Sequence, residues 1–417
     1  MEKPVKAIVN GTLINGTGAP PLKDSVIIIE GPTIAEVGQV GHVRIPGDAE
    51  IINAKHRIVL PGLIDCHTHI SEGITASPAT GWGTLEYSIA DKTILAILAV
   101  KKLLGSGITT IRDLGSSGHI DIAVRDAINQ GCIVGPRIFA SDAGITITGG
   151  HNDMVKSVRA LAFEGITLGD GIADGTTECI KTVRKQIRVG ADQIKIWATG
   201  GVMEVTARAG IQELSEEEIR TIIKEANRFN RFVAAHAVGP PKAIKTCAEA
   251  GVRSIEHGIF NDKESMEAMR QNRVYLVPTL VAYELLKKEI FPPTTREVAK
   301  KATTAHKETI KMAKKVGVKI AMGTDSGAPY GSVHGECQAQ ELELLVKSGL
   351  TEMEAIVAAT KTAAECIGID ATVGTIEPGK FADIIIVDGD PLEDIKVLQN
   401  KNRIKMVIKE GNIYVKR

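Results

Sequence analysis

The stretch Leu60-Pro-Gly-Leu-Ile-Asp-Cys-His-Thr-His-Ile70 is an apolar run that ends in two histidines one residue apart. Pro61 and Gly62 are typical of a turn, and the apolar residues after them indicate a buried strand. Because side chains at i and i+2 of a strand point to the same face, His67 and His69 are expected to direct their imidazoles to one point. Two hydrogen-bonded core histidines would give the same pattern, so this motif alone leaves a metal site and a structural role open.

The length and charge of the chain narrow the class of protein. Its 417 residues exceed one ordinary domain but suit a barrel of about 250 residues with an accessory domain. The 50 basic and 50 acidic residues cancel without a run of like charge, so neither nucleic acid nor a membrane is an expected partner. No segment reads as a membrane span, and the six cysteines form no C-x-x-C pair. We therefore expect a soluble, cytoplasmic protein with a small-molecule ligand.

The order of apolar segments predicts an α/β fold. Residues 1–59 and 371–417 read as short strands between glycine turns, and the two ends are expected to pair into a small β-sandwich. Between them, in 60–370, strands alternate with helical segments, including a long helical region over 281–316 and a last strand over 318–322. Eight such strands predict a (β/α)₈ TIM barrel.

Polar residues end several of the predicted barrel strands. Barrel enzymes carry their chemistry at the C-terminal ends of the strands. Imidazoles and a carboxylate that converge there are typical ligands of a hydrolytic divalent metal site, most naturally zinc. The candidates are His67 and His69 on the first strand, Lys195 in the fourth, His236 and His257 at the ends of the fifth and sixth, and Asp325 after the eighth.

Lys195 needs a separate explanation, because an ammonium group is not a metal ligand. Two metal ions held close together require a bridging anion, and a lysine carboxylated by carbon dioxide supplies one on a long side chain. The alternative is a buried lysine paired with an acid. Its place on the strand opposite the histidines favours the carboxylated form.

With these residues in place, the chain resembles the metal-dependent amidohydrolase superfamily over nearly its whole length. The similarity rests on Pro61-Gly-Leu-Ile-Asp-x-His-x-His69, Lys195, the two single histidines, Gly323-Thr-Asp-Ser326 and Gly374-Thr-Ile-Glu-Pro-Gly-Lys-Phe-Ala-Asp383. The resemblance implies two zinc ions per chain. His67, His69 and Asp325 would hold one, His236 and His257 the other, and carboxylated Lys195 would bridge them. It also implies a homo-oligomer.

Within that superfamily the chain looks most like the prolidase-like branch, which hydrolyses Xaa-Pro and other dipeptides or N-acyl amino acids. Thr148-Gly-Gly-His-Asn-Asp153, Lys195-Ile-Trp-Ala-Thr-Gly-Gly201 and Ala235-His-Ala237 carry this similarity. The deaminase branch places a His-x-x-Glu element where this chain has His236-Ala-Val-Gly-Pro240. The proton shuttle of a deaminase would therefore be missing here.

The resemblance implies that a metal-bridging hydroxide attacks an amide next to a free carboxylate, while Asp325 accepts its proton and passes it to the leaving nitrogen. His151, Arg208 and His334 are candidates for holding the substrate, and His151 is also a candidate catalytic residue. Two alternatives stay open. One is a hydrolase of cyclic amides or ring C–N bonds of the imidazolonepropionase-like kind, and the other is a metal-free barrel protein without catalysis.

Overall fold

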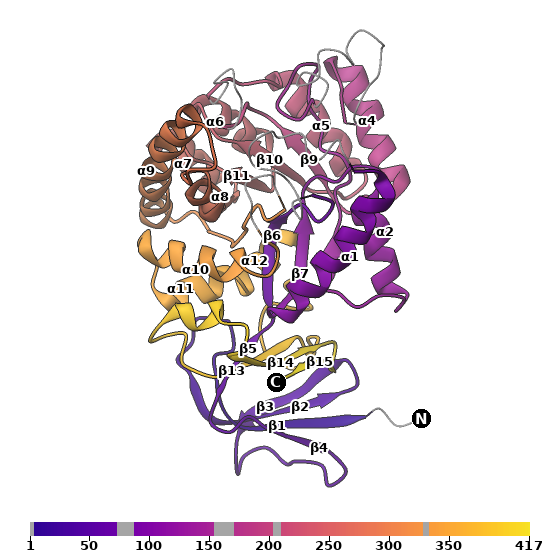
Figure 1. Ribbon diagram of the computed structural model, residues 1–417, viewed down its shortest axis with the longest axis vertical. Coiled ribbons are helices and arrows are strands. Elements are labelled where there is room, and N and C mark those ends of the chain that lie inside the picture. The colour runs from indigo at the N-terminus through magenta and orange to yellow at the C-terminus, as the bar shows by residue number, and fades with distance from the viewer. Residues whose placement is uncertain (1–3, 73–86, 154–170, 203–209, 328–332) are drawn as a thin grey trace.

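The computed structural model describes residues 4–72, 87–153, 171–202, 210–327 and 333–417. Figure 1 shows a sheet at one end of the molecule, where both chain termini lie, and a larger body of strands and helices above it. In the described part of the chain, no helix combines the length and the apolar character that a membrane span requires.

Strands from both chain ends form one hydrogen-bonded sheet of eight strands in the described residues, in the order β15-β14-β13-β5-β1-β2-β3, with β4 beside β1. The two ends meet where β5 pairs antiparallel with β13, with Leu60 opposite Ile385. The arrangement of this sheet as two packed layers stays a prediction. The strands are β1 (Val5–Leu13), β2 (Leu22–Glu30), β3 (Thr33–Gln39), β4 (Glu50–Asn53), β5 (Ile58–Pro61), β13 (Ile384–Val387), β14 (Ile404–Lys409) and β15 (Asn412–Lys416).

The central body contains two parallel sheets, β6-β7-β8 and β12-β11-β10-β9. Nearly all residues of these strands are buried, as expected for parallel strands covered by helices. The strands are β6 (Leu63–Thr68), β7 (Ile108–Asp113), β8 (Arg137–Phe139), β9 (Ile194–Trp197), β10 (Val233–Ala237), β11 (Ser254–His257) and β12 (Tyr275–Val277).

Helices follow most of these strands and cover their outer faces (Figure 1). Ser215 and Glu218 form the capping box at the start of α5. The predicted long helical region is two helices, α8 and α9, because Pro292 and Pro293 begin a new helix there. The helices are α1 (Ile89–Gly105), α2 (Ile120–Asn129), α4 (Gly175–Val189), α5 (Glu216–Arg228), α6 (Pro241–Ala250), α7 (Lys263–Gln271), α8 (Leu280–Leu285), α9 (Pro293–Val316), α10 (Cys337–Lys347), α11 (Glu352–Ala358), α12 (Lys361–Ile367) and the 3₁₀ helix η3 (Ile395–Gln399).

The segment 318–322, predicted as the eighth barrel strand, is not a full strand. It forms one isolated bridge, between Ile320 and Leu276 of β12, and the backbone N–H of Cys66 in β6 donates to the carbonyl of Met322 at 2.9 Å. On the other side, Ile145 bridges to Ile196 of β9. The described parallel strands are therefore two sheets of four and three joined by single bridges, and not the closed eight-stranded barrel that the sequence predicts.

Candidate active site

Three of the predicted ligands meet at the end of β6. The Nε2 atom of His69 lies 3.0 Å from Oδ1 of Asp325, and Nε2 of His67 lies 3.4 Å from the same oxygen. One ligand atom from each residue lies within 4.8 Å of the others, and all three side chains are buried. This group has the residue types and the spacing of a metal site.

Hydrogen bonds at the far side of each imidazole determine which nitrogen faces Asp325 as an acceptor. Nδ1 of His69 lies 3.0 Å from the carbonyl oxygen of Gly115, and Nδ1 of His67 lies 2.9 Å from Oε2 of Glu256. Since both partners are acceptors, each Nδ1 is the donor, and each neutral ring presents the Nε2 lone pair to the carboxylate. Two lone pairs and a carboxylate oxygen that face one another require a cation between them. The residues present therefore fit a metal ion.

Without a metal ion, a proton between His69 and Asp325 supplies the positive charge. Burial lowers the pKa of His69, but the hydrogen bond to Asp325 and the charges of the nearby carboxylates together outweigh burial and raise the pKa to about 9. Burial raises the pKa of Asp325, but the neighbouring His67 and His69 more than offset this and lower it. Asp325 is therefore a carboxylate at neutral pH, as a metal ligand must be.

A second pair of histidines lies beside the first group. The rings of His236 and His257 have centroids 4.5 Å apart, and His257 lies 5.2 Å from His67. Nδ1 of His257 is 2.7 Å from Oγ1 of Thr279, whereas neither nitrogen of His236 has a hydrogen-bond partner among the described residues. Burial lowers the pKa of both rings well below the usual value, assisted by the charge of Lys195 at His257 and by His257 at His236. Both are neutral imidazoles, the form that binds metals.

Lys195 projects from β9 into this group of histidines. It is fully buried, and its Nζ has no hydrogen-bond partner among the described residues. Nζ lies 4.7 Å from the ring centroid of Trp197 on the same strand. Burial lowers the pKa of Lys195 to about 8, although Glu256 and Asp325 act in the opposite direction. A buried ammonium without a hydrogen-bonded partner is costly, so this site favours a neutral amine or a chemically modified lysine.

Left-handed backbone at three positions brings site residues to the ends of the strands. His257, Thr279 and Asp325 have φ values of 70°, 55° and 58°. Such angles cost about 1–3 kcal/mol each for residues other than glycine and are found mostly at functional sites. The turn at His257 explains how both Glu256 and His257 reach the site from adjacent positions of one strand.

Glu256 and Arg112, which no sequence motif singled out, support His67 on the side away from Asp325. The two oxygens of Glu256 contact Nδ1 of His67 at 2.9 Å and the guanidinium of Arg112 at 2.8 Å, and all three side chains are buried. Nε of Arg112 also donates to the carbonyl of Cys66 at 2.6 Å. The sequence did carry a signal for Glu256. It is an acid that directly precedes the predicted ligand His257 on a strand, where side chains alternate between the two faces.

Asp65 is a further buried acid that sequence analysis did not consider. It accepts hydrogen bonds from the backbone N–H groups of His67 and Thr324, each at 3.0 Å, and from the hydroxyl of Thr324 at 2.6 Å. Asp65 thereby joins the strand of His67 to the loop that carries Asp325. Burial raises its pKa to about 6 despite these hydrogen bonds.

The structure places the three predicted substrate-binding residues differently. His151 lies at the site, with its ring stacked 4.6 Å from His236 and tilted 5.0 Å from Trp197. His334 is buried and contacts Ser326, with Nδ1 and Oγ 3.0 Å apart, so it supports the loop that carries Asp325. Arg208 falls outside the described residues.

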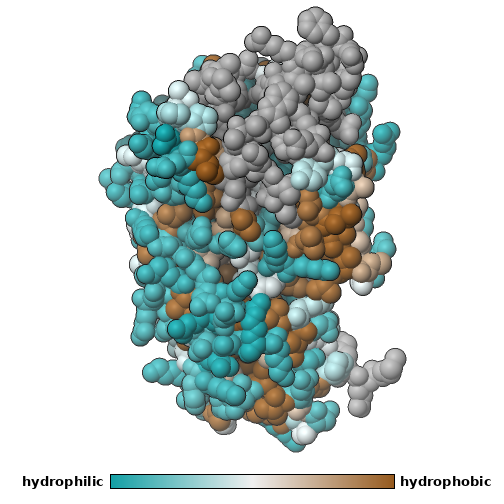
Figure 2. Space-filling model, viewed as in Figure 1, coloured by the Kyte–Doolittle hydropathy of each residue, from teal (hydrophilic) through white to brown (hydrophobic). Residues whose placement is uncertain are grey.

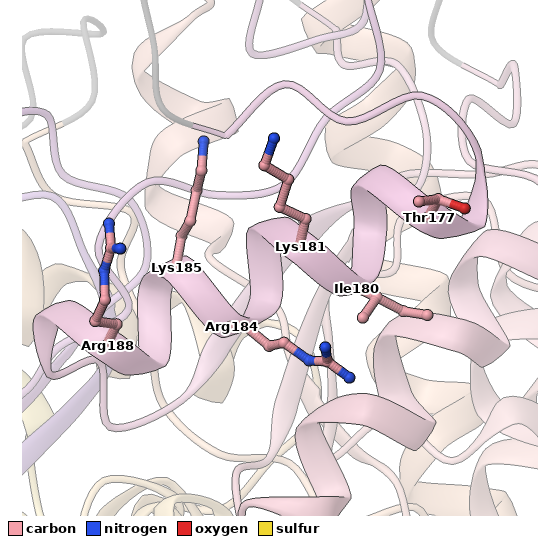
Figure 3. A pocket seen from close by; sticks show the side chains of 6 residues that line it. All are labelled: Thr177, Ile180, Lys181, Arg184, Lys185 and Arg188. Carbon is pink, nitrogen blue, oxygen red and sulfur yellow. The ribbon is translucent and has the colours of Figure 1, made fainter.

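A hollow of about 460 Å³ lies over α4, on the outer surface, and contains none of the predicted site residues (Figure 3). Four cations, Lys181, Arg184, Lys185 and Arg188, line it together with Thr177 and Ile180. It offers neither imidazole nor carboxylate. The hollow is therefore unsuited to the metal chemistry of the histidine group.

Comparison with known proteins gives the family. The model of the amidohydrolase family matches residues 58–414, which include every residue of the histidine group. The chain belongs to the amidohydrolase family. Ochratoxinase from Aspergillus niger is 33% identical over 442 residues, which cover 99% of this chain and 87% of that protein. This membership identifies the chain as a hydrolase that acts on amide bonds.

Two solved structures are similar over almost the full length of the chain. A Xaa-Pro dipeptidase with methionine bound in its active site superimposes with a TM-score of 0.88 at 34% identity, covering 99% of this chain and all of that one. A prolidase complexed with N-methylphosphonate-L-proline superimposes with a TM-score of 0.86 at 29% identity, covering 99% of this chain and all of that one. These similarities confirm the prediction of the prolidase-like branch.

Proposed function

We propose that this amidohydrolase cleaves an amide bond next to a free carboxylate, with Xaa-Pro and other dipeptides or N-acyl amino acids as substrates. The observation that carries the proposal is the convergence of His67, His69 and Asp325 beside His236 and His257. The buried Lys195 lies with them, and its Nζ has no hydrogen-bond partner in the described part of the chain. The similarity to a dipeptidase and a prolidase supports the choice of substrate.

Two zinc ions fit the donor set. His67, His69 and Asp325 would hold one ion, His236 and His257 the other, and Lys195 in its carboxylated form would bridge them. When bound, the ions would polarise the substrate carbonyl and lower the pKa of a bound water to about 7. The low pKa of Lys195 supports carboxylation, because only the neutral amine reacts with carbon dioxide.

Asp325 is the proposed proton carrier. It is buried, ionised at neutral pH and hydrogen-bonded to His69, so its carboxylate can take a proton from the attacking water and release it to the leaving nitrogen. Its left-handed backbone and the contacts of Asp65 and His334 with the adjoining residues keep the carboxylate beside the two imidazoles.

His151 is the proposed contact for the substrate carbonyl or α-carboxylate. Its backbone N–H donates to Oε2 of Glu213 at 2.7 Å, and its ring packs on His236. Arg208 stays a candidate for the same carboxylate, because a guanidinium binds a carboxylate with two parallel hydrogen bonds. For His334 we propose a positioning role through Ser326.

The activity is tested with zinc-loaded protein and a library of dipeptides and N-acyl amino acids, each paired with its C-terminally amidated form. We expect hydrolysis of the free acids and little hydrolysis of the amides. Equal turnover of both sets would exclude recognition of the carboxylate. No turnover of either set would overturn the proposed substrate class and favour ring amides, and a protein that binds no zinc would favour the non-catalytic alternative.

For the fold, we propose that the two parallel sheets are parts of one eight-stranded barrel. The single bridges from Ile320 to Leu276 and from Ile145 to Ile196, and the bridge from Ser326 to Thr68, support this arrangement. For the location, we propose the reducing cytoplasm. The six free cysteines, five of them buried, support it.

A further inference from the structure

Helix α1 presents large apolar side chains to the surface. Ile94 is 60% exposed and Leu98 is 47% exposed, one helical turn apart, while Ala96, Val100 and Leu103 of the same helix are buried. Figure 2 shows a hydrophobic patch over the part of the surface that α1 forms. Contiguous exposed apolar surface of this kind marks a contact with another molecule.

The spacing of residues on this face describes a seam. Asp91, Ile94, Leu98 and Lys101 are exposed and follow one another at intervals of three, four and three residues, which keeps them on one side of the helix. The seam is symmetric about position 96. Its centre is apolar, its N-terminal end is acidic and its C-terminal end is basic.

We propose that α1 packs antiparallel against α1 of a second copy of this chain about a two-fold axis. In that register Ile94 of each copy contacts Leu98 of the other, and Asp91 of each copy lies opposite Lys101 of the other. A parallel arrangement would place like charges together at both ends. A two-fold contact requires a surface that complements itself, and this seam does so in charge and in apolar character.

This inference does not rest on the proposed activity, because α1 carries none of the residues of the histidine group. The charges at the two ends of the seam also indicate that the binding partner is a second copy of this chain. A partner with a uniform charge would meet attraction at one end of the seam and repulsion at the other, whereas a reversed second copy meets attraction at both ends.

The test compares the mass of the full chain and its variants by sedimentation equilibrium over a wide range of concentration. We expect the wild-type protein to contain an even number of copies and the double variant Ile94→Glu/Leu98→Glu to have half its mass. The matched control is Ile51→Glu on β4, which alters an equally exposed isoleucine (53%) and should keep the wild-type mass. Circular dichroism would verify that each variant is folded.

Charge variants test the antiparallel register. Lys101→Glu places an acid opposite Asp91 in both halves of the contact and should weaken association. Asp91→Lys/Lys101→Glu restores opposite charges in both halves and should recover association, although it removes the Asp91 side chain from the capping box with Ser88. A monomeric wild-type protein, an unchanged mass for Ile94→Glu/Leu98→Glu, or no recovery in the double charge variant would overturn the proposal.

Discussion

Nδ1 of His67 lies 2.9 Å from Oε2 of Glu256, and the other oxygen of Glu256 lies 2.8 Å from the guanidinium of Arg112. The three buried groups form a chain from a cation through a carboxylate to an imidazole. Burial lowers the pKa of the Arg112 guanidinium, but its neighbours, with the charge of Glu256 first among them, together outweigh burial and raise it. Glu256 thereby fixes His67 with Nε2 directed at Asp325.

Replacing Glu256 with Gln should weaken metal binding and stability together. The amide keeps the size of the side chain but leaves Arg112 without its buried counter-charge, which costs about 3–5 kcal/mol in such pairs. Loss of the carboxylate behind a metal-binding histidine lowers metal affinity by about 10- to 100-fold. Zinc affinity measured by competition with a chelator, and the thermal midpoint, would check both effects.

Glu249→Gln is the matched control, because Glu249 lies on the surface of α6 in an ion pair with Lys245. That variant should bind zinc as the wild-type protein does. If Glu256→Gln also retained wild-type zinc affinity, then Glu256 would not orient His67.

Lys195→Ala should abolish turnover and reduce the bound zinc, because the proposed bridging carboxylate would be lost. A second measurement uses the wild-type protein without any substitution. Metal-free protein should regain activity with zinc faster when bicarbonate is present than in buffer stripped of carbon dioxide, since the proposed bridge requires that the neutral amine first be carboxylated. Lys181→Ala, on the exposed face of α4, should behave as wild type. Equal recovery with and without bicarbonate would exclude carboxylation of Lys195.

Gly201→Ala should impair substrate binding through His151. A Cβ atom at position 201 would lie 2.2 Å from Cε1 and 2.6 Å from Nε2 of the His151 ring, so the ring must move away from His236. We expect KM to rise on the order of tenfold, the effect of losing about one hydrogen bond, with zinc content unchanged. Steady-state kinetics and metal analysis would measure these two effects.

A comparison with His151→Ala separates this effect from general damage. If both variants act through the same ring, combining them should raise KM little further than His151→Ala alone. Gly47→Ala is the control, since a Cβ there meets no atom within 4 Å. Additive effects of the two substitutions would show that Gly201 acts on something other than His151.

The first strand of the parallel sheet and its two histidines were predictable because a period of two and an apolar run are local properties. The ends of the later strands were also readable, since His236 directly follows the apolar run 232–235, Asp325 comes shortly after the apolar run 320–322, and His257 ends the short segment 253–257. The left-handed backbone of His257 and Asp325 could not be predicted, because a non-glycine residue adopts this conformation only when the surrounding structure imposes it. Strict alternation would have pointed Glu256 inward and His257 away.

Contacts between distant segments were beyond the reach of the sequence. Arg112 and Glu256 lie on β7 and β11, and no local pattern indicates that they meet behind His67. His334 was a candidate for holding the substrate, and its hydrogen bond to Ser326 could not be read from the sequence. The segment 318–322 has the composition of a strand, but it forms only one β-bridge in the described structure. How many backbone pairs it makes depends on where β12 and β6 lie, which the sequence of the segment does not encode.

Glu341 should make the stability of the protein depend on pH. Its oxygens accept hydrogen bonds from the backbone N–H groups of Leu280 and Val281 at 2.9 and 2.7 Å, at the start of α8. Burial raises the pKa of Glu341 from 4.5 to about 8, because the two backbone hydrogen bonds, which lower the pKa, do not offset the loss of water. Between these two values the folded protein holds a proton that the unfolded chain has released.

Unfolding free energy should therefore fall as pH rises from about 5 to about 8, by a few kcal/mol in the limit of full burial. Glu341→Gln removes the titrating group and should lose less stability over the same range. Thermal midpoints at about pH 5 and about pH 9 would measure the difference. Glu343→Gln, two residues along the same helix, alters an acid whose pKa is lowered by Lys347 and should keep the wild-type dependence. Equal losses in wild type and Glu341→Gln would show that Glu341 is ionised in the folded protein, with the two backbone N–H groups sufficient to hold its charge.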